Sequence, residues 1–329
     1  MTDTGRSRKT VSLPAPPRDV PADEPGGLSL EHIVFQGDAH SQIGERPGVR
    51  PGLNPVRRPA APSRTHLDPA LARFYDRLFE LSNLRISYYR ASVLKRRGPA
   101  CLRALRVEDP GRAVELLSAD TLATERALRA AMIGVTSFFR DPRVLRGLEP
   151  FLVQMSRNRV RGLRVLSVGC SDGSEVYSIA IRLRELGIEV EALDGVDCRS
   201  DAIRMAQSGV YPRDRLAHVP EQILSRFFKP HEADKRGALQ VIDEIRDRCR
   251  WRIGDALELP EGPQYDLVVC RNLVIYLKPE SAARLWRKLA GHLEPDGLLM
   301  VGKAERPMPD QRLDRIGPSL YRRRHPEHD

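Results

Sequence analysis

The sequence predicts an α/β protein, in which a parallel β-sheet flanked by helices follows a small all-α domain. The first observation is a set of short apolar runs that alternate with helical sequence, at 165–168, 192–196, 267–270 and 298–301. Such alternation is typical of buried strands in a doubly wound sheet. The second observation is helical periodicity without such runs in the part of the chain that precedes them.

Length and composition agree with two domains and a tail. The chain has 329 residues, which is more than one small core needs. Its hydrophobic content of 41% and charged content of 30% are typical of soluble globular proteins, and no apolar run approaches the roughly 18 residues of a membrane span. The N-terminus also lacks the apolar core of a signal peptide. We therefore expect a cytoplasmic protein without membrane insertion.

Charge and cysteine content limit the kinds of partner and cofactor that are expected. The formal net charge of +10 favours an anionic partner, which could be a nucleic acid or an acidic protein surface. Charge alone does not choose between the two. The 5 cysteines show neither CxxC pairing nor interleaved histidines, so we expect a reducing compartment and no zinc or other metal site.

The N-terminal region, residues 1–66, is rich in proline and poor in large apolar residues. Ordering such a segment costs conformational entropy that little burial would offset. The sequence therefore predicts a disordered Pro-rich tail.

The helical N-terminal domain is predicted over residues 67–135. Apolar residues recur there at helical spacing, beginning with Leu71, Phe74, Tyr75, Leu78 and Leu81. Similar periodicity returns over 114–117 and 122–132. Breaks are expected at Gly98-Pro99 and at Asp109-Pro110-Gly111.

The α/β domain is predicted over residues 136–329. One amphipathic helix follows the first strand, with Val176, Ile179, Ala180 and Leu183 on one face. A later helix is predicted to carry Leu285, Leu289 and Leu293 along one face.

A glycine-containing turn joins the first predicted strand to this helix, in the run Arg164–Ser178. Gly169 and Gly173 allow the backbone to approach a ligand, and the free N–H groups of the helix start point toward it. Taken alone, the pattern fits a tight turn in any α/β protein equally well.

An acid at the end of the second strand strengthens a nucleotide-site interpretation. Asp197 lies a little over 20 residues beyond the turn, where a carboxylate that accepts from ribose hydroxyls is found in this kind of fold. Asp194 is a rival for this position, and either residue could be a solvated turn residue. A dinucleotide dehydrogenase would present a similar acid, so these features leave the cofactor open.

Three segments together resemble the signature blocks of CheR-type methyltransferases, enzymes that esterify glutamate side chains of chemotaxis receptors. They are Ile133-Gly-Val-Thr-Ser-Phe-Phe-Arg-Asp141, Gly169-Cys-Ser-Asp-Gly-Ser-Glu-Val-Tyr-Ser178 and Cys270-Arg-Asn-Leu-Val-Ile-Tyr276. Their order and separations are also similar to those of the family, and the resemblance extends from about residue 67 to 324.

The resemblance implies a Rossmann-like domain that binds S-adenosylmethionine over the carboxyl ends of its strands, releases S-adenosylhomocysteine and uses no metal. It also implies which residues surround the cofactor. Together with the glycine turn, this predicted cofactor set is Thr136, Arg140, Gly169, Ser171, Gly173, Glu175, Asp197, Asp255, Ala256, Asn272 and Leu273.

Arg140 and Tyr276 are the predicted catalytic residues, because the resemblance places them beside the transferred methyl group and its acceptor. Other roles remain open for these side chains. Arg140 could pair with Asp141 or another surface acid, Tyr276 could be a core aromatic, and Glu175 could merely favour a helix start.

The chain also departs from the family pattern at two places. It has Ser174-Glu175 where the family often has two acids, and Lys303-Ala304-Glu305 where the family often has His-Ser-Glu. These differences put the optimal geometry of the site in question.

The predicted activity is S-adenosylmethionine-dependent O-methylation of glutamate side chains on a methyl-accepting chemotaxis or other signalling protein. Glutamate has an ordinary pKa near 4.3, so the acceptor is ionised at neutral pH and needs no general base. The expected partner is an acidic helical region of that protein. A basic cluster in the helical domain suits it, although it could equally be a solvated face: Arg90, Lys95, Arg96, Arg97, Arg103 and Arg106.

Two other functions are compatible with some of these features. A nucleic-acid methyltransferase would suit the positive charge, but enzymes that methylate base amines resemble one another in an Asn/Asp-Pro-Pro-aromatic stretch where this chain reads Cys270–Tyr276. We therefore expect no stable nucleic-acid partner. The second alternative is a catalytically weak binding or scaffold module that keeps the fold. The departures at Ser174 and Lys303-Ala304 favour it. The presence of the polar residues expected in the site opposes it, namely Thr136, Arg140, Asn272 and Tyr276.

Overall fold

The computed structural model describes residues 67–324 except 133, 135, 232–236 and 309–311. The predicted disordered tail at 1–66 lies outside the described residues. All described residues belong to one compact unit.

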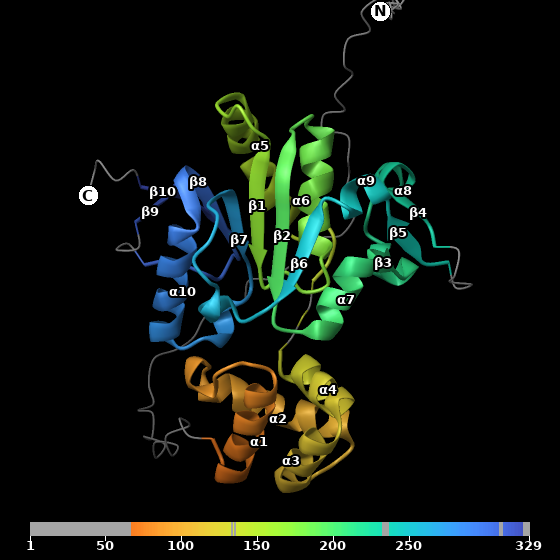
Figure 1. Cartoon of the computed structure of the whole chain (residues 1–329), viewed down its shortest axis with the longest axis vertical. Coiled ribbons are helices and arrows are strands. Elements are labelled where there is room, and N and C mark those ends of the chain that lie inside the picture. The colour runs from red at the N-terminus through yellow and green to blue at the C-terminus, as the bar shows by residue number, and fades with distance from the viewer. Residues whose placement is uncertain (1–66, 133, 135, 232–236, 309–311, 325–329) are drawn as a thin grey trace, which may run out of the picture. The chain divides into compact units, whose positions relative to one another are not determined.

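Helices alone make up the first part of the described chain (Figure 1). Three of them begin at an aspartate, as Asp68, Asp109 and Asp120 each accept hydrogen bonds from backbone N–H groups of the first turn. The elements are α1 (Pro69–Leu81), the 3₁₀ turn η2 (Ile86–Tyr88), α2 (Ala91–Leu105), α3 (Pro110–Ala119) and α4 (Thr121–Ala131).

The predicted break at Gly98-Pro99 is wrong, because α2 continues through both residues. Pro99 removes one backbone donor, but it lies on the exposed side of the helix, as does Lys95 one turn earlier. Gly98 lies against Leu71 of α1, and a Cβ atom there would meet the Leu71 methyl carbons at 3.0 Å. Packing against α1 therefore outweighs the local tendency of Gly-Pro to end a helix.

A mixed sheet forms the second part, with strand order β6-β2-β1-β7-β8-β10-β9. Neighbours from β6 to β8 pair in parallel, whereas β10 pairs antiparallel with both β8 and β9. The strands are β1 (Leu163–Val168), β2 (Val190–Asp197), β6 (Cys249–Ile253), β7 (Tyr265–Cys270), β8 (Leu293–Val301), β9 (Leu313–Arg315) and β10 (Leu320–Arg323). The predicted apolar runs lie in β1, β2, β7 and β8, so the α/β fold is confirmed.

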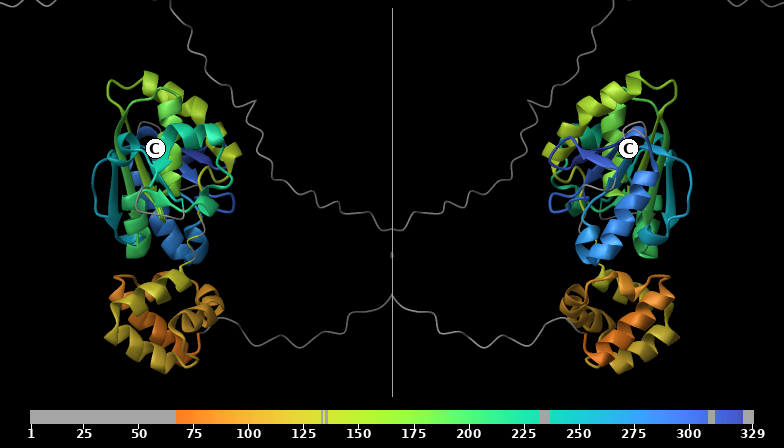
Figure 2. Two further views of the ribbon diagram at one scale, coloured as in Figure 1. Left: turned by 90° about the vertical axis from the view of Figure 1, so that its right-hand side faces the viewer. Right: turned by 90° about the vertical axis from the view of Figure 1, so that its left-hand side faces the viewer.

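Helices cover both faces of this sheet (Figure 2). Side chains of α5 and α6 pack on one face with Val165, while α10 and the helical part pack on the other with Leu166 and Val168. The covering elements are α5 (Pro142–Arg157), α6 (Ser174–Glu185), α7 (Ser200–Ser208) and α10 (Pro279–Gly291).

The prediction that Leu293 belongs to the later helix is wrong. Helix α10 ends at Gly291, and Leu293 is the first residue of β8, where it is paired with Tyr265. The carbonyl of His292 accepts from the Tyr265 N–H, which draws the chain into the sheet immediately after the helix. Leu293 is fully buried in either arrangement, so its apolar character could not distinguish helix from strand.

A smaller sheet that the sequence did not predict follows α7. Its strands pair antiparallel in the order β3-β5-β4. Its elements are β3 (Val210–Tyr211), the 3₁₀ turn η3 (Arg213–Leu216), α8 (Glu221–Phe227), β4 (Phe228–Pro230), β5 (Leu239–Val241) and α9 (Asp243–Arg246). Phe138 packs edge-on against Tyr211 and Phe228, so this sheet supports the segment that leads to Arg140.

The helical part contacts the sheet part through both backbone and side chains. The region around η2 contacts two short 3₁₀ turns of the sheet part, η4 (Ala256–Glu258) and η5 (Val274–Tyr276). The backbone N–H of Arg90 donates to the Tyr276 carbonyl at 3.0 Å, and the Tyr88 hydroxyl donates to Glu258 at 2.6 Å. The segment that carries Tyr276 is therefore held by residues of the helical part.

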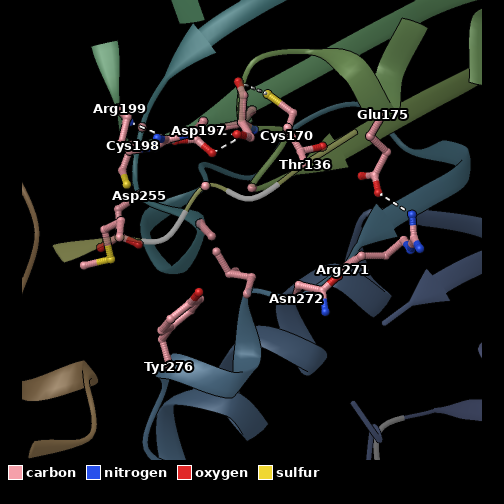
Figure 3. A pocket seen from close by; sticks show the side chains of 18 of the residues that line it. Thr136, Cys170, Glu175, Asp197, Cys198, Arg199, Asp255, Arg271, Asn272 and Tyr276 are labelled. Atoms are coloured by element: carbon pink, nitrogen blue, oxygen red, sulfur yellow. Dashed lines mark hydrogen bonds and ion pairs between the residues drawn. The ribbon is translucent and has the colours of Figure 1, made fainter. Parts of the chain in front are cut away.

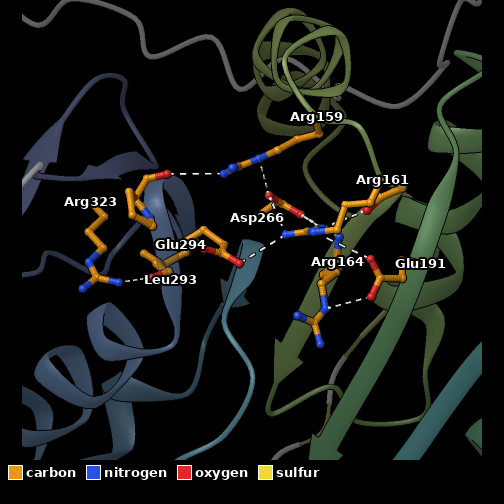
Figure 4. A network of polar contacts seen from close by, with 10 residues as sticks. Arg159, Arg161, Arg164, Glu191, Asp266, Leu293, Glu294 and Arg323 are labelled. Carbon is orange, nitrogen blue, oxygen red and sulfur yellow. Dashed lines mark hydrogen bonds and ion pairs between the residues drawn. The ribbon is translucent and has the colours of Figure 1, made fainter.

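A charged network occupies the amino ends of β1 and β7, at the other end of the strands from their carboxyl edge (Figure 4). Asp266 is fully buried and accepts from Arg161 at 2.7 Å, from Arg159 at 2.9 Å and from a backbone N–H. Arg161 also donates to Glu294 at 3.2 Å. This network ties strand ends together far from the carboxyl edge of the sheet.

None of the described helices is both long enough and apolar enough to cross a membrane.

Candidate active site

A pocket that is open to solvent lies over the carboxyl ends of β1, β2 and β7 (Figure 3). Strands β2 and β6 are added on one side of β1, whereas β7 and β8 are added on the other side. Ligands of doubly wound sheets bind at the position where the strand order changes direction in this way. The pocket is lined by almost all of the predicted cofactor set, namely Thr136, Arg140, Gly169, Ser171, Glu175, Asp197, Asp255, Ala256, Asn272 and Leu273.

The glycine turn after β1 forms the floor beside the start of α6. Gly169 has φ +74° and Gly173 has φ +85°, a region that favours glycine. A Cβ atom at Gly169 would lie 3.0 Å from the Leu273 side chain, and one at Gly173 would lie 2.8 Å from Ala206 and Trp251. Gly173 thus allows the turn to pack closely against Ala206 and Trp251, but it does not line the pocket.

The structure distinguishes the two candidate ribose acids. Asp197 ends β2 and lines the pocket, where its carboxylate accepts from the backbone N–H groups of Ser171 and Arg199, both at 2.9 Å. Asp194 instead accepts from the Tyr265 hydroxyl at 2.7 Å. The position predicted for the ribose-binding carboxylate is therefore that of Asp197, and its ligand role stays a prediction.

Asp255 follows β6 and lines the pocket. Its Oδ1 accepts from the Leu257 N–H at 2.9 Å, whereas its Oδ2 is buried without a hydrogen-bond partner among the described residues. Burial raises the pKa of this carboxyl group, because the charged form loses hydration. An unpartnered acceptor beside Ala256 fits the exocyclic amine of an adenine ring.

Asn272 and Leu273 line the pocket just after β7. Asn272 has φ +60°, a left-handed conformation that asparagine tolerates better than most residues. Glu305 holds this turn: its carboxylate accepts from the N–H groups of Asn272 and Val274, both at 2.7 Å, and from Gly302 at 2.9 Å. The sequence did not predict this supporting role for Glu305.

Tyr276 lies across the pocket from Asp197 (Figure 3). Burial raises the pKa of its phenol, and the nearby positive charges of Arg97 and Arg140 offset only part of this effect. The hydroxyl is therefore protonated at neutral pH and able to donate a hydrogen bond.

Arg140 lines the same pocket. Its neighbour Asp141 forms ion pairs with Arg271 and Lys303, so Asp141 has strong partners other than Arg140. This arrangement weakens the interpretation of Arg140 as the structural partner of Asp141.

Sequence reasoning missed two buried arginines of the site. Arg199 donates to the Ser171 hydroxyl at 2.7 Å and covers Gly134, where a Cβ atom would lie 2.3 Å from its guanidinium. Arg271 donates to Glu175 at 3.0 Å, which gives that acid a specific partner inside the pocket. Arg271 stands within the block Cys270–Tyr276, so its position was visible in the sequence, but its direction was not.

Among the described residues, no group of three or more His, Cys, Asp or Glu side chains is arranged to hold a metal ion.

Fold and pocket together define the class: a Rossmann-like methyltransferase whose cofactor is S-adenosylmethionine. Residues 134–316 match the family model described as "CheR methyltransferase, SAM binding domain". The chain therefore belongs to the CheR methyltransferase family, and the resemblance drawn from the sequence is confirmed.

Similar proteins carry related names. The chain is 29% identical over 261 residues to "Chemotaxis protein methyltransferase 2" of Pseudomonas aeruginosa, a match covering 75% of this chain and 90% of that protein. It is 28% identical over 246 residues to "Chemotaxis protein methyltransferase" of Salmonella typhimurium, covering 72% and 84%. It is also 32% identical over 182 residues to "Probable biofilm formation methyltransferase WspC" of P. aeruginosa, covering 54% and 43%.

We expect Asp255→Asn to weaken binding of S-adenosylmethionine and S-adenosylhomocysteine about tenfold. The Leu257 N–H would retain the amide oxygen, which places the amide NH₂ where Oδ2 now stands and opposes one donor to another. Calorimetric titration with each ligand measures this. Unchanged affinity would remove Asp255 from the predicted adenine contacts.

The same substitution should stabilise the ligand-free protein by on the order of 1 kcal/mol at pH 7, because it removes a buried charge whose Oδ2 has no hydrogen-bond partner among the described residues. The raised pKa of Asp255 favours folding at low pH, and this contribution is lost as the pH rises through that pKa. The advantage of Asn should therefore shrink toward pH 4. Urea unfolding of both proteins at pH 7 and at the lower pH provides the comparison.

Proposed function

We propose that this chain transfers the methyl group of S-adenosylmethionine to glutamate side chains of a methyl-accepting signalling protein in the cytoplasm. The observation that carries the proposal is the positive charge around the Tyr276 hydroxyl. Arg140 and Arg199 line the same pocket as Tyr276, and their positive charges, together with those of Arg96 and Arg97, offset part of the rise in the pKa of its phenol that burial causes. An anionic acceptor is attracted to such a position, whereas a neutral base amine gains nothing from it.

The pocket residues have complementary roles in this proposal. Asp197 would accept from the ribose hydroxyls and Asp255 from the adenine amine, while Glu175 would face the methionine end. The bound cofactor supplies a methyl group on a positively charged sulfur. Arg140 and the Tyr276 hydroxyl would hold the acceptor carboxylate in line with that methyl group.

No general base is needed for this reaction, because a glutamate with an ordinary pKa near 4.3 is already ionised at neutral pH. Catalysis would then depend on alignment of the reacting groups and on exclusion of water. A protonated Tyr276 suits this role, since it can donate to the carboxylate without removing a proton.

The departures from the family pattern have partners in the structure. The Ser174 hydroxyl and N–H both donate to Asp172, at 2.6 Å and 3.1 Å, and Lys303 forms an ion pair with Asp141. Both residues therefore support the turns around the pocket. These contacts favour an active enzyme over a binding module whose site has decayed.

The names of the relatives support an acceptor in signalling but do not restrict it to one pathway, since they mention both chemotaxis and biofilm formation. The direct test is methyl transfer from labelled cofactor to membranes of the native host. Base-labile release of methanol is expected, because an ester hydrolyses readily in base. Transfer that is stable in base, or transfer to nucleic acid, would contradict the proposal.

The proposed docking surface for an acidic helix is the exposed side of α2. Lys95, Arg96, Arg103 and Arg106 are exposed there. Two members of the predicted cluster have structural partners instead. Arg97 donates to the Ala130 carbonyl at the end of α4, and Arg90 donates to the Leu277 carbonyl. Charge reversal at these two positions would disturb the fold, so a test of docking should leave them unchanged.

The double substitution Lys95→Glu with Arg96→Glu should raise the KM for the acceptor about tenfold at low ionic strength and leave cofactor affinity unchanged. The effect should diminish as salt is added. A matched control is Arg250→Glu with Arg252→Glu, which changes the net charge equally on the exposed strand β6. Equal effects of the two pairs would indicate a general charge effect and no docking surface on α2.

Arg140→Lys should lose turnover nearly as severely as Arg140→Ala, by about a hundredfold, because a lysine cannot reproduce the fixed fork of donors that holds a carboxylate. Turnover per folded molecule and the melting temperature are measured for both variants. Near-normal turnover in Arg140→Ala would remove Arg140 from the catalytic step. A loss confined to the melting temperature would assign it a structural role.

A further inference from the structure

We infer that Arg271 is a positioning residue that holds the cofactor side and the acceptor side of the pocket in one fixed geometry. It acts through Glu175 on one side and through the Arg140-Asp141 segment on the other. The consequence for methyl transfer rests on the proposed function, whereas the positioning itself concerns only this chain.

Arg271 is well placed to join two parts of the site. It follows β7 directly, and its side chain is 3% exposed. Its Nη1 donates to Glu175 at 3.0 Å (Figure 3), and its Nη2 donates to Asp141 at 2.6 Å and to the Arg140 carbonyl at 3.2 Å. The planar guanidinium thus reaches two carboxylates and one backbone carbonyl at once.

Glu175 is fixed through both of its oxygens. The second oxygen accepts from the hydroxyl of Ser167 at 2.9 Å, and Ser167 is a fully buried residue of β1. Glu175 therefore has a defined direction relative to the sheet, and it lines the pocket in the first turn of α6. Arg271 links the carboxylate of Glu175 to the Arg140-Asp141 segment on the other side of the pocket.

The side chain of Asp141 binds Arg271 and does not cap the helix that follows it. It stands at the N-cap of α5, where an aspartate normally accepts from the N–H groups of the first turn, but its side chain makes no such bond. Its backbone is left-handed, with φ +56°, a conformation that is unfavourable for a residue with a side chain. A residue is held in this way where the surrounding contacts require it.

Lys303 completes the arrangement by pairing with the other oxygen of Asp141. Burial alone would raise the pKa of Asp141, but the Lys303 hydrogen bond and the charge of Arg271 hold it below its ordinary value. Asp141 is therefore a carboxylate at neutral pH, as an ion pair with both cations requires. Two carboxylates and two cations then alternate as Glu175, Arg271, Asp141 and Lys303.

The segment before Asp141 is anchored to the same helix as Glu175. The N–H of Phe139 donates to the Ser178 hydroxyl at 2.8 Å, and Phe139 also has a positive φ of +50°. Arg140 lies between this anchor and the bond that Arg271 makes to its carbonyl. The backbone of Arg140 is thus held on both sides, which fixes the position from which its side chain extends.

The test uses Asp141→Asn and Arg271→Lys in the full chain. Asp141→Asn removes the ion pair and leaves Glu175 with its partner, so we expect kcat for methyl transfer to fall about tenfold while cofactor affinity changes less than about threefold. Arg271→Lys cannot reach both carboxylates, so kcat should fall about a hundredfold. Arg271→Ala is avoided, because it would leave two carboxylates without their shared cation.

The matched control is Arg161→Lys. Arg161 also bridges carboxylates, those of Asp266, Glu294 and Glu191, but at the amino ends of the strands (Figure 4). We expect this variant to lose melting temperature and to keep its turnover per folded molecule. A role of Arg271 that is only structural would make Arg271→Lys behave in the same way, and that result would overturn the inference.

Hydrogen exchange of the backbone provides a measurement that needs no acceptor. Exchange over residues 136–141 should become faster in Arg271→Lys and in Asp141→Asn, and it should not change in Arg161→Lys. Unchanged exchange in the first two variants would overturn the inference even if turnover fell. Absence of methyl transfer by the unaltered chain would contradict the proposed function instead, and the exchange result would still decide the role of Arg271.

Discussion

The parallel pairing of β1 with β2 on one side and β7 on the other is the constraint on which the site depends. In this register Val168 is opposite both Val196 and Cys270, so the strands end at the same edge of the sheet. Gly169 and Asp197 come directly after Val168 and Val196, and Arg271 and Asn272 follow Cys270, so these residues must lie around one space. Residues that are far apart in the sequence converge because the register of two strand pairs fixes where each loop begins.

The loops at this edge are fixed by buried polar groups as well as by glycine. Glu305 gathers the N–H groups of the turn after β7, and Asp197 gathers those of the turns after β1 and β2. Each carboxylate accepts hydrogen bonds from backbone N–H groups that have no partner within a strand or helix. These bonds stabilise the irregular backbone at the pocket wall. The contact between Arg90 and Tyr276 adds the helical part to the same wall. Acceptor docking on α2 would consequently act on a segment already joined to Tyr276.

Much of this arrangement could be predicted where local pattern and global fold agree. Buried strands, the glycine turn and the acid at the end of β2 all have sequence signals that depend on near neighbours. The errors arose where tertiary contacts decide: Pro99 stays in a helix because α2 packs on α1, and Leu293 starts a strand although its spacing continues a helix. The directions of Arg199 and Arg271 are of the same kind. A sequence shows that an arginine is present, but its partners come from elements far away in the chain.

The distribution of charge within the pocket matches the two reactants of the proposed reaction. Glu175, Asp197 and Asp255 present carboxylates where the cofactor would lie, and that cofactor offers hydroxyl and amine donors and a positive sulfur. Arg140 and Arg199, by contrast, act on the Tyr276 hydroxyl, where a carboxylate acceptor would come. The carboxylates keep defined directions because each has partners within the protein. Glu175 accepts from Arg271 through one oxygen and from the Ser167 hydroxyl through the other. Asp197 accepts from the backbone N–H groups of Ser171 and Arg199 and also pairs with the Arg199 guanidinium at 3.5 Å, so the direction of this carboxylate is fixed by contacts within the protein.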